Sequence, residues 1–238
     1  MKTILNLLLV LTSFVLVENG NSQGFVNLDF EDATIVPDPS SPYYPYAVYA
    51  TNAIPGWVPD GFLGTNEISY NDLSLGAPSV SLFGTNGPYP VIAGAFSIDL
   101  YGGSGGLSGG ASISQIGLVP SDTRAILFKA QSVLGTLSVA LGGQNIPYSP
   151  IGTGPNYTLY GGNIPLELAG KMEQLMFKAS TGGNNYWEID DILFSSSPVP
   201  EPGALGLFAL SGLLLSLRLR KFPGRLLRYK RLYKLGGQ

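Results

Sequence analysis

The chain has 238 residues, a formal net charge of −3, and neither cysteine nor histidine. Without cysteine no disulfide holds the fold, and without histidine the usual catalytic triads and the commonest ligand of catalytic zinc are excluded. Once targeting segments at the two ends are set aside, the remaining length suits one sizeable domain.

The charge is distributed unevenly along the chain. Residues 23–197 hold four basic residues against 14 acidic ones, a net charge of about −10, whereas eight basic residues follow Leu217. An acidic body of this kind repels phosphate backbones, so we expect no nucleic-acid binding.

The N-terminus predicts a signal peptide over residues 1–22. Lys2 precedes an apolar run over residues 4–17, which is shorter than a membrane span. Gly20 and Ser22 stand at positions −3 and −1 of a cleavage site before Gln23. Cleavage after Asn19 and an uncleaved N-terminal anchor are the alternatives.

Residues 23–197 predict an all-β domain. Apolar and polar residues alternate with period two in short segments separated by turn residues. We expect strands at residues 25–31, 79–83, 95–100, 111–118, 125–130, 137–141, 157–160, 175–179 and 186–194. About ten short strands in a body of this length favour a jelly roll or another β-sandwich.

Three stretches are predicted to be irregular. Residues 37–60 carry six prolines and several aromatic residues, which favours a long packed loop or an extended edge. Residues 102–110 are rich in glycine and serine and predict a hairpin tip, and residues 165–175 have room for one short helical turn.

Three different segments follow one another over residues 198–221. Pro200 and Pro202 keep the sequence Val199-Pro200-Glu201-Pro202 out of helical conformation. The uncharged run 203–217 predicts a transmembrane helix about 23 Å long. Arg218, Arg220 and Lys221 follow it and predict a cytoplasmic C-terminal side.

This order of segments resembles the PEP-CTERM sorting signal of exported bacterial proteins. The resemblance implies that an exosortase, a membrane protease, recognises Pro200, Glu201 and Pro202 and passes the protein towards the cell surface or extracellular matrix. The alternative is an ordinary membrane anchor that no exosortase processes. Residues 222–238 extend beyond the usual signal as a basic cytoplasmic tail, which either lies on anionic lipid or has no role.

The body resembles galactose-binding-like jelly rolls found in bacterial carbohydrate-binding modules. The resemblance rests on Asn27-Leu28-Asp29-Phe30-Glu31, on Pro55-Gly56-Trp57 and on the sequence from Tyr186 to Ile192. It implies that Glu31 and either Asp190 or Asp191 hold a structural calcium ion, although no cofactor is required. The alternative is that these carboxylates are solvated or cap turns.

Aromatic residues in the predicted loops are candidates for stacking on sugars. They are Tyr43, Tyr44, Tyr46, Trp57, Tyr148 and Tyr157. Packing within the loops explains the same residues equally well.

The sequence carries no sign of catalysis. Asp190 and Asp191 are adjacent in a predicted strand, so we expect their carboxylates to face opposite sides, and no serine-nucleophile or metal-ligand motif is present. We therefore expect a non-catalytic protein of the cell envelope or matrix. Its body either binds carbohydrate such as exopolysaccharide, or is structural or adhesive without a specific ligand.

Overall fold

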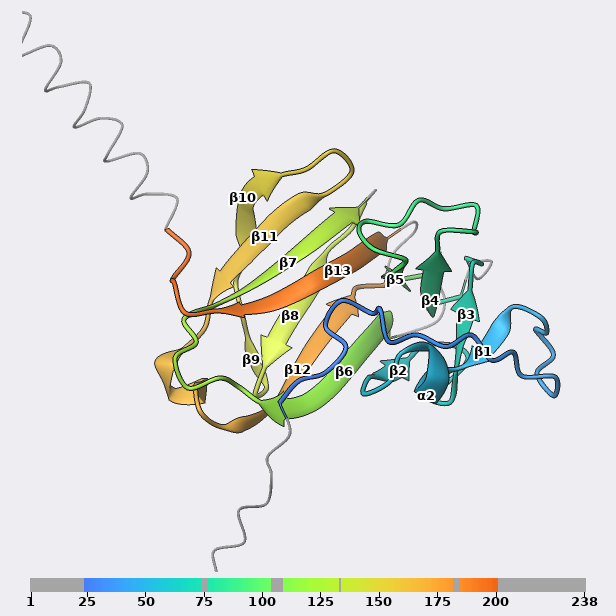
Figure 1. The fold of residues 1–238 in the computed structure, drawn as a ribbon, viewed down its shortest axis with the longest axis horizontal. Coiled ribbons are helices and arrows are strands. Elements are labelled where there is room, and N and C mark those ends of the chain that lie inside the picture. Colours follow the sequence, from blue (N-terminus) through green and yellow to red (C-terminus); the bar gives the residue numbers. More distant parts are fainter. Residues whose placement is uncertain (1–23, 74–76, 104–108, 133, 182–184, 201–238) are drawn as a thin grey trace, which may run out of the picture. The chain divides into compact units, whose positions relative to one another are not determined.

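The computed structural model describes residues 24–73, 77–103, 109–132, 134–181 and 185–200 (Figure 1). The predicted signal peptide 1–22, transmembrane helix 203–217 and tail 222–238 lie outside these ranges, as do residues 104–108 of the predicted hairpin tip. Contacts divide the chain into two compact units, Met1–Pro198 and Val199–Gln238, and every strand belongs to the first. None of the helices in the described ranges is long and apolar enough to cross a membrane.

The body is a β-sandwich-like fold with almost no helix. Its strands are β1 (Ala47–Tyr49), β2 (Val58–Asp60), β3 (Glu67–Tyr70), β4 (Ser79–Gly84), β5 (Phe96–Tyr101), β6 (Ala111–Leu118), β7 (Ala125–Ser132), β8 (Leu137–Leu141), β9 (Gln144–Asn145), β10 (Ser149–Thr153), β11 (Thr158–Asn163), β12 (Met172–Ala179) and β13 (Tyr186–Ser195). The helical elements are one turn of α-helix, α2 (Ala50–Ala53), and one 3-10 turn, Leu166–Leu168.

The strands form two sheets. The larger has the order β1-β3-β4-β5-β13-β7-β11-β10, and the smaller has the order β2-β6-β12-β8-β9. The pairings within them are antiparallel except for that of β3 with β4. Figure 1 shows β13 running between β5 and β7 in the larger sheet.

Most of the predicted strands are confirmed, because each has one face in the core. In β8, Leu137, Val139 and Leu141 are buried while Ser138 is exposed, and β12 alternates in the same way from Leu175 onwards. Core residues from the two sheets meet between them: the Phe128 ring of β7 lies 5.3 Å from the Phe177 ring of β12. The predicted helical turn within residues 165–175 is the 3-10 turn.

The first predicted strand, residues 25–31, is wrong. Asn27 and Phe30 have φ angles of 49° and 59°, the left-handed region, so the segment turns instead of extending. It is hydrogen-bonded to both sheets: the Val26 amide donates to Gln115 Oε1 of β6 at 2.6 Å, and the Ile192 amide of β13 donates to the Leu28 carbonyl at 2.9 Å. The N-terminal segment therefore connects β6 of the smaller sheet with β13 of the larger sheet.

The region 37–60 is more regular than the sequence predicts. It contains β1, α2 and β2, of which β1 pairs with β3 and β2 pairs with β6. These elements are only three or four residues long, so their period-two pattern is too short to distinguish from a loop.

Candidate functional site

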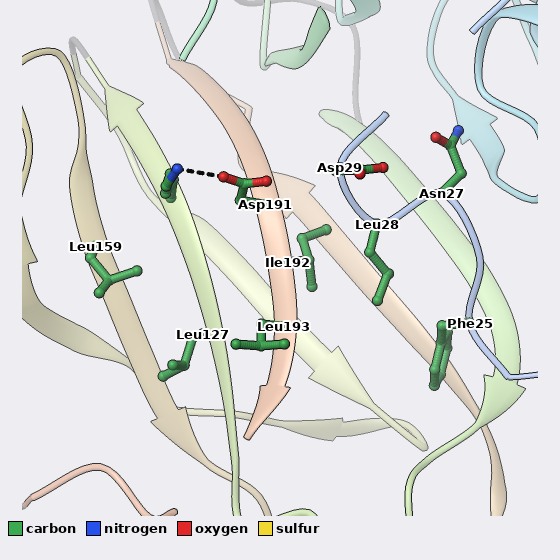
Figure 2. Close-up of a pocket in the computed structure, with 10 residues that line it drawn as sticks. Phe25, Asn27, Leu28, Asp29, Leu127, Leu159, Asp191, Ile192 and Leu193 are labelled. Carbon is green, nitrogen blue, oxygen red and sulfur yellow. Dashed lines mark hydrogen bonds and ion pairs between the residues drawn. The ribbon is translucent and has the colours of Figure 1, made fainter. Parts of the chain in front are cut away.

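A groove lies on the outer face of the larger sheet, on the side away from the core. It has a volume of about 630 Å³ and is formed by β7, β11, β13 and the N-terminal segment (Figure 2). We call it the main groove; its lining is Phe25, Asn27, Leu28, Asp29, Leu127, Lys129, Leu159, Asp191, Ile192 and Leu193. The lining combines an apolar surface with two carboxylates and one ammonium group.

A bulge in β13 creates the charged part of the main groove. The register between β13 and β7 shifts between Asp190 and Leu193, and Asp191 has a φ angle of 47°. This bulge turns the Asp191 carboxylate towards Lys129, and the two groups form an ion pair. The hydrogen bond that the Lys129 ammonium donates to Asp191 is the main reason why the pKa of Lys129 is raised.

The expectation that Asp190 and Asp191 face opposite sides is wrong for the same reason. Asp190 lies opposite Lys129 in the strand register, and both carboxylates act electrostatically on that ammonium group. Asp190 is 1% exposed and accepts a hydrogen bond from the Ala93 amide at 3.0 Å. Burial raises the pKa of Asp190 to about 8.

Three hydrogen bonds with Gln115 and Trp57, together with the backbone bond from Ile192 to Leu28, hold the N-terminal wall of the main groove in place. Gln115 Nε2 donates to the Val26 carbonyl at 3.0 Å, and Gln115 Oε1 accepts from the Val26 amide. The Gln115 side chain thus makes the two bonds to Val26 that the backbone of a neighbouring strand would make. The indole N–H of Trp57 donates to the Asn27 carbonyl at 2.9 Å. Since the wall has no ladder of its own, its position depends on these side chains.

A second hollow lies beside the main groove at the β10–β11 hairpin. It has a volume of about 380 Å³ and is lined by Gln131, Ser132, Thr153, Gly154, Pro155, Asn156, Tyr157, Thr158 and Tyr160. The Lys129 ammonium lies 4.9 Å from the centre of the Tyr157 ring. The main groove and the second hollow therefore meet at the contact between Lys129 and Tyr157.

The structure separates the six predicted sugar-stacking residues into three groups. Tyr157 lines the second hollow. Tyr43, Tyr44 and Tyr46 are each at least half exposed in the loop before β1. Trp57 and Tyr148 belong to the packed interior: Trp57 is 4% exposed, and the Tyr148 hydroxyl donates to the Leu137 carbonyl at 2.8 Å.

The three predicted calcium ligands are engaged with protein donors. Glu31 Oε1 accepts the amides of Ala95 and Phe96 at 2.8 and 3.1 Å, and Asp191 pairs with Lys129. Within the described ranges, no group of three or more acidic side chains is arranged to hold a metal ion. Calcium binding by Glu31, Asp190 and Asp191 stays a prediction.

Of the residues that line the main groove, only Asp191 is among the ligand candidates that the sequence predicts. Lys129, Leu127 and Leu159 were assigned only to strands, and Phe25 and Asp29 to a strand that does not form. They meet because of strand register and the β13 bulge, and neither leaves a local pattern in the sequence.

The comparisons with known proteins decide the nature of the C-terminal segment. Residues 198–221 match the model of the PEP-CTERM protein-sorting motif. The chain carries a PEP-CTERM sorting motif. The predicted recognition residues Val199, Pro200, Glu201, Pro202, Arg218, Arg220 and Lys221 all fall within it. From Glu201 onwards the PEP-CTERM motif lies outside the residues that the structure describes.

No curated protein matches the chain. Among solved structures, the body is similar to TmCBM61, a carbohydrate-binding module determined in complex with beta-1,4-galactotriose. The two are 14% identical with a TM-score of 0.34, and the match covers 73% of this chain and 100% of that one. It is also similar to the enzymatically active domain of tailspike protein 4 of bacteriophage CBA120, with 15% identity, a TM-score of 0.32 and coverage of 59% of this chain and 19% of that one. At these TM-scores neither similarity decides the ligand or the chemistry.

Proposed function

We propose that this is an exported, non-catalytic surface protein whose body binds carbohydrate along the main groove and the second hollow. The observation that carries the proposal is the contact of Lys129 with the Tyr157 ring, which joins an apolar groove to a polar hollow on one open sheet face. A sugar presents apolar C–H faces and polar hydroxyl edges, and a mixed lining of this kind suits both.

The geometry favours a polymer over a single small sugar. The main groove offers Leu127, Leu159 and Leu193 as an apolar floor, and the second hollow offers the side-chain amides of Gln131 and Asn156. Because the two join at Lys129, a chain of several sugar units contacts both, as an exopolysaccharide would.

The same geometry argues against glycoside hydrolysis. That reaction needs one carboxylic acid with a raised pKa and a second, ionised carboxylate facing the bond to be broken. The carboxylates that line the main groove are Asp29 and Asp191, and Asp191 is paired with Lys129. Asp190 has a raised pKa, but it is buried and does not line the groove.

The PEP-CTERM motif supports the route to the surface. We propose that an exosortase-type membrane protease processes the chain at this motif, after insertion of residues 203–217 into the membrane with the body outside and the tail in the cytoplasm. Replacing Glu201 with Ala should prevent processing, so that the precursor accumulates in the membrane of an exosortase-containing host. A control variant, Glu167→Ala, removes an exposed carboxylate from the body and leaves the motif and the predicted signal peptide intact. If the Glu201 variant is processed as fast as the control, the chain is an ordinary anchored protein.

Binding is tested on the full chain in a non-glycosidic detergent, because a sugar-based detergent competes for the site. The assay is isothermal titration against a panel of neutral and acidic polysaccharides. Tyr157→Ala should weaken binding roughly 2- to 30-fold, since an aromatic contact of this kind contributes about 0.5–2 kcal/mol. Tyr44→Ala is the matched control, because it removes an equally large ring from the exposed loop.

The two variants distinguish the alternatives. Loss of binding in Tyr44→Ala with normal binding in Tyr157→Ala moves the ligand to the loop before β1. Absence of saturable binding in the wild-type chain leaves a structural or adhesive surface protein without a specific ligand.

A further inference from the structure

A pair of buried carboxylates lies on the part of the outer sheet face that the groove does not use. Asp99 of β5 and Glu188 of β13 are directly opposite in register, and each is fully buried. Side chains at directly opposite positions have Cβ atoms roughly 5 Å apart. Ser81 of β4 continues the same row on the far side of Asp99.

Residues 85–95, the strap, connect β4 to β5 and are fastened over this part of the sheet. The Tyr89 ring stacks on Phe83 with centroids 4.6 Å apart, and Ile92 is buried. The Ala93 amide donates to Asp190, and Asn156 Nδ2 donates to the Val91 carbonyl at 3.0 Å. The strap excludes water from a surface whose side chains are polar, which is an unusual arrangement.

The hydrogen bonds of the two carboxylates differ. Glu188 accepts from the Ser97 hydroxyl and from Gln131 Nε2. Neither oxygen of Asp99 has a hydrogen-bond partner among the described residues, and the buried hydroxyl of Ser79 has none either. The Leu100 amide lowers the pKa of Asp99 from nearby, yet it makes no hydrogen bond of normal geometry to the carboxylate.

An unpaired, desolvated carboxylate is strongly unfavourable unless a proton or a cation compensates its charge. Burial, followed by repulsion from Glu188, raises the pKa of Asp99 well above its usual range. Burial also raises the pKa of Glu188, although Ser97, Gln131, Tyr186 and the Ile92 backbone oppose the shift. Lys129 does not serve as a counter-ion for the two carboxylates, because its ammonium group is already paired with Asp191.

We propose that Asp99 and Glu188 bind one calcium ion beneath the strap. Two carboxylates together carry the charge that a divalent ion neutralises, and the two Asp99 oxygens, which have no partner among the described residues, are hard ligands of the kind that calcium prefers. Magnesium fits less well, because it gives up its water shell reluctantly and the strap leaves the site dry. This site differs from the predicted one at Glu31, Asp190 and Asp191.

The test uses the full chain in a non-glycosidic detergent at pH 7, after treatment with a chelator. Calcium at about 100 times its Kd should raise Tm by roughly 5–10 °C for a body of this size, and magnesium at the same concentration should raise it much less. Isothermal titration should give one ion for each chain. Asp99→Asn and Glu188→Gln should each weaken calcium binding at least ~10-fold.

Asp190→Asn is the matched control, since it removes a buried carboxylate from the same strand and should keep calcium affinity within about twofold. Where Asp99→Asn does not fold, Glu188→Gln carries the test, because the glutamine oxygen can replace Oε2 as the acceptor from Gln131 and its amide N–H can donate to the Ser97 hydroxyl. The proposal is overturned if calcium leaves the Tm of the wild-type chain unchanged. It is also overturned if Asp190→Asn abolishes binding while Asp99→Asn and Glu188→Gln bind normally, because the ion then lies at the other site.

Discussion

Replacing Trp57 should destabilise the body, because the indole ring is part of the core and not of the proposed binding site. The indole ring packs between Phe30 and Phe177, with ring centroids 5.7 and 6.5 Å away, and its N–H is bonded to the Asn27 carbonyl. Trp57→Ala removes a large core side chain and should cost about 3–5 kcal/mol, which corresponds to a fall in Tm of roughly 6–20 °C. Trp57→Phe keeps most of the packing but leaves the Asn27 carbonyl without its donor, at a cost of about 1–3 kcal/mol.

Thermal unfolding followed by far-UV circular dichroism measures both variants on the full chain. Tyr157→Ala is the comparison, because its ring lies in an open hollow and its loss should cost less than about 1 kcal/mol. The reasoning is refuted if Trp57→Ala melts within about 2 °C of the wild type and yet no longer binds polysaccharide. Trp57 would then face the ligand and not the core.

Two further changes test other parts of the structure. Gln115→Leu removes both hydrogen bonds to Val26, so it should lower the free energy of unfolding by about 2–4 kcal/mol and weaken polysaccharide binding by loosening the groove wall. Chemical denaturation measures the first effect and isothermal titration the second. Unchanged binding would show that other contacts hold the wall. Asp190→Asn tests the pH dependence of stability in the presence of chelator. The pKa of Asp190 is about 8 in the folded state and about 3.9 in the unfolded state, so between these pH values the folded state holds a proton that the unfolded state loses. The free energy of unfolding therefore falls by up to about 1.4 kcal/mol per pH unit between about pH 4 and 8. In urea unfolding, the free energy of unfolding of the variant should fall less steeply from pH 5 to pH 8 than that of the wild type. An identical slope would mean that Asp190 is ionised throughout this range.

The strands that the sequence predicts well are those with one face in the core over five or more residues. β7 and β12 are examples, because burial of Ile126 and Phe128, or of Leu175 and Phe177, leaves a readable alternation. The N-terminal segment shows the same alternation without forming a strand. Asn27 is a residue type that tolerates the left-handed region, but nothing local in the sequence marks Phe30 as left-handed. The segment is positioned by bonds of Trp57 to Asn27 and of Gln115 to Val26, both far along the chain.

The candidate site was predictable only in part. Tyr157 was identified as a ring in a loop, which is a local property. The ion pair of Lys129 with Asp191 joins residues 62 positions apart and depends on a bulge. Asp99 and Glu188 are likewise brought together only by the pairing of β5 with β13, so neither looks unusual in its own strand.

Two side chains that line the second hollow, Asn156 and Gln131, also bond to the covered half of the outer sheet face. Gln131 lines the second hollow and at the same time donates a hydrogen bond to Glu188, so its amide belongs both to the proposed sugar site and to the buried carboxylate pair. A proton or a cation that changes the charge on Glu188 changes the strength of that hydrogen bond, because a bond to an ionised acceptor is roughly twice as strong as one to a neutral acceptor. Burial of Glu188 beneath the strap therefore bears on the second hollow, because its hydrogen bond orients the Gln131 amide that the proposed sugar site presents.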